Sequence, residues 1–148
     1  MTTSSREHTL FIAVLTLSSE ITQQAADLLK PFGLSTAQFN VLRVLRGAGA
    51  MPPDGDGLAC SEIAERLLTK GPDITRLLDR LEAQGLIERE RDTEDRRVVT
   101  ARITDSGLRL LESIDEPMAD LHRRQFEHLG RDEMAELTRL VVAATPHD

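Results

Sequence analysis

The side chains in this sequence that most clearly suggest chemistry are arginines at helical spacing. Arg76 and Arg80 lie four positions apart in the segment TRLLDRL, so both project from one face of a predicted helix. A guanidinium is a planar fork of N–H donors that matches two adjacent acceptors on guanine, or the oxygens of a phosphate. The alternative is a solvated helix face with weak ion pairs, because Asp79 lies between the two arginines.

A second basic group, Asp95-Arg96-Arg97, lies in a polar segment between two stretches of β-forming sequence, residues 86–91 and 98–103. Two such stretches around a charged turn predict a β-hairpin. An arginine at the tip of a hairpin can reach a phosphate or a narrow minor groove. The alternative is a salt bridge between Asp95 and Arg97 that only stabilises the turn.

The elements that must position these arginines are mostly helices. An apolar stripe at steps of three and four predicts a long helix over residues 6–30, and Ser35 with Gln38 forms a capping box for a second helix that ends at Gly47. Residues 47–57 are rich in Gly, Pro and Asp and predict a linker with neither helix nor strand. After it, Ser61 is predicted as the N-cap of a third helix.

The remaining helices follow from similar signals. Pro72 suits the first turn of a helix over residues 72–84, which Gly85 closes. Thr104 and Asp105 are predicted to cap a fifth helix, which Pro117 is expected to kink or interrupt. A last helix carries apolar residues from Met134 to Ala144.

Helix, tight break, helix, glycine and an arginine-tipped hairpin follow one another in the order of a winged helix-turn-helix. The stretch SEIAERLLTKGPDITRLLDRLEAQGLIERERDTEDRRVVTARIT, residues 61–104, resembles the MarR (multiple antibiotic resistance regulator) family of transcription factors. The resemblance rests on the helix TRLLDRLEAQGLIER and on the wing from Asp95 to Thr104, and the long flanking helices agree with it. We therefore expect a mainly α (α+β) fold. A winged helix-turn-helix DNA-binding lobe would occupy residues 35–104, and a helical dimerisation region residues 1–34 and 105–148.

This resemblance implies that Arg97 enters a minor groove of double-stranded DNA, with Asp95 orienting it. We expect Arg76 to contact a base edge, whereas Ser61 and Lys70 are better suited to phosphates. The complete set of expected DNA-binding residues is Ser61, Lys70, Pro72, Asp73, Thr75, Arg76, Arg80, Asp95, Arg96 and Arg97.

The resemblance also implies a homodimer that represses transcription at a pseudo-palindromic site and responds to a small aromatic or anionic ligand. The expected dimer interface comprises Leu10, Val14, Leu17, Leu137, Leu140 and Val141. Candidate effector-pocket residues are Phe11 and Phe39, with Arg43 and Arg46 as anion anchors or, alternatively, as exposed helix-end arginines. A winged-helix module that binds protein instead of DNA is the competing hypothesis.

Other classes of function lack the residues they need. The single cysteine, Cys60, cannot form an internal disulfide, and the four histidines have no zinc-ligand spacing. No catalytic motif, metal site or cofactor motif is present. No apolar run is long enough for a membrane span, and no export signal precedes the first helix, so we expect a cytoplasmic protein. A redox-sensing regulator based on Cys60 is a further alternative, although a buried structural thiol is the commoner case.

The net charge of −7, taken alone, argues against DNA as a partner. However, residues 60–104 contain nine of the 18 basic groups and ten of the 25 acidic ones, which leaves −1 there and −6 elsewhere. The acidity therefore lies mainly outside the proposed DNA-binding face. A nearly neutral lobe predicts modest affinity for non-specific DNA.

Overall fold

The computed structural model describes residues 5–67 and 73–147, in which six α-helices and three short strands are found. The helices are α1 (Arg6–Leu29), α2 (Thr36–Gly47), α3 (Cys60–Arg66), α4 (Ile74–Ala83), α5 (Asp105–Phe126) and α6 (Arg131–Ala144). A 3₁₀ turn, η1 (Lys30–Phe32), follows α1. The strands are β1 (Leu58–Ala59), β2 (Ile87–Arg91) and β3 (Val99–Ile103). This is the mainly α winged helix-turn-helix fold that the sequence predicts.

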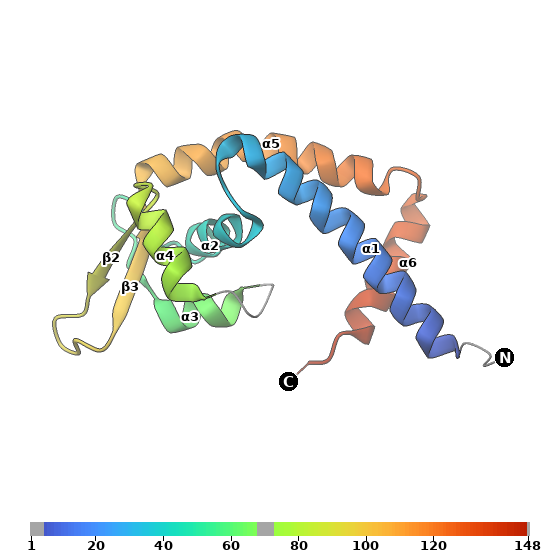
Figure 1. Cartoon of the computed structure of the whole chain (residues 1–148), viewed down its shortest axis with the longest axis horizontal. Coiled ribbons are helices and arrows are strands. Elements are labelled where there is room, and N and C mark those ends of the chain that lie inside the picture. Colours follow the sequence, from blue (N-terminus) through green and yellow to red (C-terminus); the bar gives the residue numbers. More distant parts are fainter. Residues whose placement is uncertain (1–4, 68–72, 148) are drawn as a thin grey trace.

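The molecule has two regions, which α5 connects (Figure 1). On one side α2, α3, α4 and the sheet form a lobe around a common apolar core. On the other side α1 and α6 extend away from that lobe. The core of the lobe is fully buried and is formed by Val41, Leu42, Leu45, Ile63, Leu81, Ala101 and Ile103, each no more than 1% exposed.

The wing is a three-stranded antiparallel sheet in the order β1-β3-β2. Its hairpin register pairs Ile87 with Ile103 and Arg91 with Val99, so the tip between them is formed by residues 92–98. The sequence predicts β2 and β3 to within one residue but does not predict β1, which is only two residues long. β1 pairs with β3 and leads directly into α3.

Two glycines are needed where the elements of the lobe join. Gly85 follows α4 with φ of 74°, a left-handed conformation that turns the chain into β2. Gly107 lies in the first turn of α5, where a Cβ would overlap the Leu86 carbonyl and the Ile103 side chain. The root of the wing and the start of α5 are therefore packed in direct contact.

Three details of the predicted helices are wrong. Ser61 is not an N-cap, because α3 begins at Cys60 and its cap is Ala59, the last residue of β1 and two residues before Ser61. The described part of the fourth helix begins at Ile74, with Asp73 as its N-cap; Pro72 lies outside the described residues. α5 continues through Pro117 without interruption. The carbonyl freed by the missing proline N–H belongs to Ser113, which is exposed and can bind water.

Candidate nucleic-acid interface

Helix α4 has one buried face and one exposed face. Leu77, Leu78 and Leu81 pack into the core, while Thr75, Arg76 and Arg80 are exposed. The Asp73 carboxylate accepts a hydrogen bond from the Arg76 amide at 3.3 Å and so caps the helix. Asp73 therefore has a structural role in addition to the DNA contact proposed for it.

Arg76 and Arg80 do not pair with Asp79, contrary to the alternative of a salt-bridged helix face. Asp79 accepts a hydrogen bond instead from Arg89 on β2, with 2.6 Å between Arg89 Nη2 and Asp79 Oδ1. Among the residues that the structure describes, neither Arg76 nor Arg80 takes part in an ion pair. Both guanidinium groups are thus available to an external anion.

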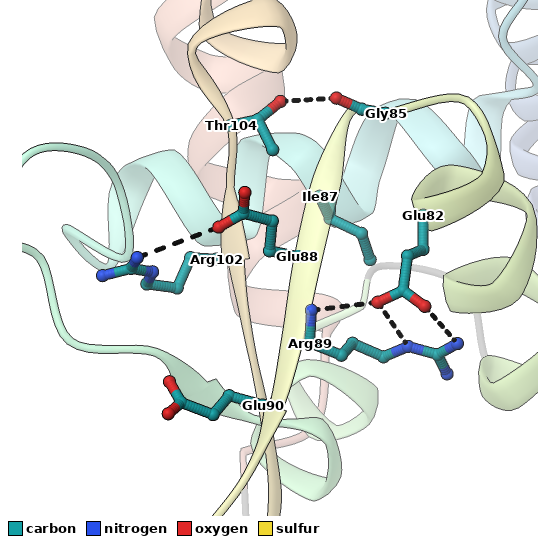
Figure 2. Close-up of a pocket in the computed structure, with 8 residues that line it drawn as sticks. All are labelled: Glu82, Gly85, Ile87, Glu88, Arg89, Glu90, Arg102 and Thr104. Atoms are coloured by element: carbon teal, nitrogen blue, oxygen red, sulfur yellow. Dashed lines mark hydrogen bonds and ion pairs between the residues drawn. The ribbon is translucent and has the colours of Figure 1, made fainter.

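Arg89 is the residue of this site that the sequence analysis missed. Its guanidinium and its amide both donate to Glu82 of α4, at 3.2 Å for Nη2 to Oε1 and 3.0 Å for N to Oε2 (Figure 2). These hydrogen bonds lower the pKa of Glu82 and raise the pKa of Arg89. The signal in the sequence is strand alternation: Arg89 follows the buried Ile87 by two residues and therefore shares its face of β2, which the turn at Gly85 brings alongside the last turns of α4.

The residues around Arg89 line a hollow of about 480 Å³ between the end of α4 and the sheet. Figure 2 shows Glu82 and Arg89 on one side of β2 and Glu88 with Arg102 on the other. Acidic and basic side chains alternate along this surface and largely neutralise one another. The hollow therefore lacks the excess of one charge that would mark it as an ion-binding site.

The tip of the wing presents Arg97 to solvent. Its side chain is 92% exposed, and Asp95 accepts hydrogen bonds from the Arg97 amide at 3.0 Å and from Nε at 3.2 Å. These bonds lower the pKa of the Asp95 carboxyl. Arg96 is also exposed, and its carbonyl accepts a hydrogen bond from Arg91. The predicted pairing of Asp95 with Arg97 is present, and it leaves the guanidinium oriented outward.

The other expected DNA-binding residues are placed as follows. Ser61 is exposed in the first turn of α3. Lys70 and Pro72 lie outside the described residues. Ser61, α4 and the wing all belong to the lobe and not to the region of α1 and α6.

The four candidate effector residues do not form one cluster. Phe39 is buried in the core at 7% exposure, whereas Phe11 lies near the beginning of α1 and is 59% exposed. Arg46 makes a two-pronged ion pair with Asp115 of α5, at 2.8 and 2.9 Å, so it is not a free anion anchor. Arg43 is exposed, and its guanidinium carbon lies 5.6 Å from the centre of the Phe39 ring.

The features that would support other functions are weak. Burial raises the pKa of the Cys60 thiol and outweighs the opposite effect of nearby Arg89, which disfavours the reactive thiolate. No group of three potential metal ligands occurs among the described residues. Within the same residues, no helix has the length and apolar character needed to cross a membrane.

The region of α1 and α6 exposes a large apolar surface. Every residue from 5 to 20 is exposed, and no residue of α6 is buried. The exposed apolar side chains include five of the six expected interface residues; the sixth, Leu137, is half-buried. The exposed apolar residues of the two helices, hereafter the α1/α6 surface, are Leu10, Phe11, Ile12, Val14, Leu15, Leu17, Met134, Leu140, Val141 and Val142.

Comparison with known proteins places these features in a family. Residues 32–98 match the model of the MarR family. The multiple antibiotic resistance protein MarR of Salmonella typhimurium is 33% identical over 119 residues, which cover 80% of this chain and 78% of that protein.

Two solved structures extend the similarity to nearly the whole chain. A MarR transcription factor from Planctomyces limnophilus is 38% identical with a TM-score of 0.72, over 97% of this chain and 100% of that one. A cysteine-to-serine mutant of Escherichia coli MarR, crystallised with operator DNA, is 27% identical with a TM-score of 0.80, over 93% of this chain and 94% of that one. The protein described here therefore belongs to the MarR family of transcriptional regulators.

Proposed function

We propose that this protein is a homodimeric transcriptional repressor that binds pseudo-palindromic double-stranded DNA through α4 and the wing. The observation that carries the proposal is the outward presentation of Arg76 and Arg80 on one helix face of the lobe that also carries the exposed Arg97. A helix of this kind fits the major groove, and a hairpin arginine fits the adjacent minor groove or a phosphate. The operator complex of the E. coli relative supports the same partner.

The α1/α6 surface supports the homodimer. Exposed apolar side chains on two helices are expected to cover one another when a second copy of the chain is present. In this proposal residues 35–104 bind DNA, and residues 1–34 and 105–148 hold the dimer together. A two-fold axis through the dimer would place the two α4 helices about one turn of DNA apart. Occupancy of a promoter by such a dimer would block transcription.

We also propose that a small anionic or aromatic ligand modulates the repressor by binding to the lobe beside α2 and α3. Arg43 is the preferred anchor, because it is exposed beside the ring of Phe39, whereas Arg46 is already bound to Asp115. A shallow cavity of about 200 Å³ lies beside Arg43 and is lined also by Asn40, Val44 and Arg66. Two guanidinium groups at one cavity favour an anion over a cation.

The DNA hypothesis is tested by selecting duplexes from a random library with the wild-type protein and measuring affinity by fluorescence anisotropy. Replacing Arg76 and Arg80 together by alanine should weaken binding at least ~100-fold and reduce the slope of log K against log salt by about two. The matched control is Arg123→Ala with Arg124→Ala, which removes the same charge from α5 and should change affinity less than about threefold. Failure to select any duplex, or equal losses in the two variants, would refute the proposal.

The competing protein-interaction module makes the opposite prediction. It would bind no duplex at low salt and would retain a stable partner other than itself. A redox regulator would require that Cys60→Ser abolish a response of DNA binding to peroxide, which the raised pKa of the partly buried Cys60 thiol makes unexpected.

A further inference from the structure

Arg89 of β2 lies where the wing packs against α4, but its guanidinium is already paired with carboxylates and is not a free cation for DNA. Its side chain is only 22% exposed, compared with 92% for Arg97. The guanidinium donates to Asp79 and Glu82, which lie one helical turn apart on α4. One strand residue thus holds two carboxylates of the adjacent helix (Figure 2 draws the Glu82 part of the contact).

The contact matters for DNA binding because of the charges on α4. The helix itself, Ile74–Ala83, contains two arginines and two carboxylates and is therefore electrically neutral. Arg89 adds one positive charge and shifts the combined surface to +1. Without Arg89, Asp79 would lie between Arg76 and Arg80 in sequence with no strand partner, available to both arginines and repelling phosphates.

Direct phosphate binding by Arg89 is the less suitable role. Three of its nitrogen–oxygen contacts with carboxylates are 3.2 Å or shorter, counting the backbone amide. A phosphate would have to displace carboxylates that already satisfy the guanidinium donors. The backbone hydrogen bond to Glu82 does not depend on the side chain, so it should keep β2 beside α4 when the guanidinium is removed.

We infer that Arg89 is a positioning residue for DNA binding that acts by holding Asp79 and Glu82 away from the α4 arginines and neutralising them, without touching DNA itself. This inference rests on the proposed DNA-binding function. Unlike the residues proposed to contact DNA, Arg89 on strand β2 would act only through its charge and its hydrogen bonds. The effect of losing Arg89 should therefore depend on the two carboxylates.

The test is a double-mutant cycle measured with the selected duplex. Arg89→Gln keeps most of the side-chain volume and should weaken binding about tenfold. Asp79→Asn with Glu82→Gln should leave wild-type affinity unchanged or raise it. The combination of all three substitutions should bind within about threefold of the Asp79→Asn, Glu82→Gln variant, because the carboxylates that Arg89 neutralises are then absent.

The matched control is Arg123, which also contacts two carboxylates, Glu116 and Asp120, but on α5. Arg123→Gln should change affinity less than about threefold, and circular dichroism should show both single variants folded. If Arg89 instead contacts a phosphate or only maintains the fold, Arg89→Gln will weaken the Asp79→Asn, Glu82→Gln variant about as much as it weakens wild type, and the inference is overturned. If Arg89→Gln binds like wild type, it is overturned as well. The wild-type protein is measured first. If it binds no duplex at all, the proposed function itself is refuted, and this outcome is distinct from failure of the inference about Arg89.

Discussion

The lobe and the α1/α6 surface use similar apolar residues in opposite ways. In the lobe, Leu42 and Leu45 of α2 are completely buried. In α1, whose apolar stripe is just as regular in sequence, Leu29 at the very end is the only buried residue. Leu10 and Val14 of the same helix are 61% and 53% exposed. The lobe closes its core within one chain, whereas α1 and α6 leave most of their apolar side chains exposed.

This difference separates the stability of the folded chain from the stability of the association between chains. Substitutions in the lobe core should change the free energy of unfolding of each chain. Substitutions on the α1/α6 surface should change how chains associate and, through the spacing of the two α4 helices, how tightly DNA is bound. Each of the following predictions tests whether the two regions can be separated in this way.

The largest effect is expected at the α1/α6 surface. Leu137→Asp together with Leu140→Asp would place two charges in the proposed interface, where they would be desolvated without partners. We expect a monomer at micromolar concentration by sedimentation velocity, and a loss of operator affinity of at least ~1,000-fold, because the second half-site no longer adds to binding.

Leu140→Met is the control, because it keeps the apolar volume and should remain dimeric. A double-aspartate variant that sediments as a dimer would show that α6 is not part of the interface. A monomeric variant that still binds the operator tightly would break the proposed link between dimer geometry and DNA binding.

The sequence predicted this contrast only in part, for a physical reason. The periodic apolar residues of α1 and α2 both predict helices, and both helices are present within one residue of the expected bounds. Periodicity indicates that a helix has an apolar face but does not specify which surface covers it. The structure shows the difference: Leu111 and Ile114 of α5 are buried within the chain, whereas the apolar stripe of α1 is exposed along most of its length.

The next largest effect is expected in the lobe core. Leu42→Ala would leave a cavity at a fully buried position of α2 and should lower the free energy of unfolding by about 3 kcal/mol. Urea unfolding at several protein concentrations would separate this loss from any change in association. The dimer dissociation constant of the folded protein should stay within about threefold of wild type.

Leu15→Ala provides the comparison, because Leu15 is half exposed on α1. It should weaken association while changing the intrinsic unfolding of the chain much less. If Leu42→Ala weakened association as strongly as Leu15→Ala, the two regions would form one cooperative unit and the contrast would fail.

Contacts between residues that are distant in sequence could not be predicted from local patterns. Asp79 was considered only with its helical neighbours, although its partner Arg89 is ten residues away and is brought close by the turn at Gly85. Arg46 was considered a free cation because its partner Asp115 is 69 residues away. Both errors have the same cause: the sequence shows which charged residues are close along the chain, but not which ones folding brings together.

Pro117 of α5 and the tip of the wing show where local sequence patterns fail and where they succeed. Pro117 is expected to kink or interrupt the helix, but α5 is not interrupted, and buried residues on both sides, Ile114 and Met118, hold it against the core. The pairing at the wing tip was easier to predict, because Asp95 and Arg97 are only two residues apart.

The smallest effect is expected where the two regions meet, at the pair between Arg46 of α2 and Asp115 of α5. The hydrogen bonds from Arg46 lower the pKa of Asp115. Since the folded pKa lies below the unfolded value of about 3.9, the pair stabilises the fold above that value. The stabilisation is lost as the pH falls from about 4 through the lowered pKa of Asp115. The Asp115 side chain is 49% exposed, so solvent screening should limit the contribution to about 1 kcal/mol or less.

Asp115→Asn should therefore unfold at lower urea concentration than wild type at pH 7, and the difference should vanish at the lowest pH of the series. Asp120→Asn is the control, because Asp120 pairs with Arg123 within α5 and does not join the two regions. Asp115→Asn should also leave the affinity for the selected duplex within about threefold, since the core contacts of α5 through Leu111 and Ile114 remain. A large loss of DNA affinity without a loss of stability would instead show that this pair sets the angle between the lobe and α5. The two regions would then not act independently in DNA binding.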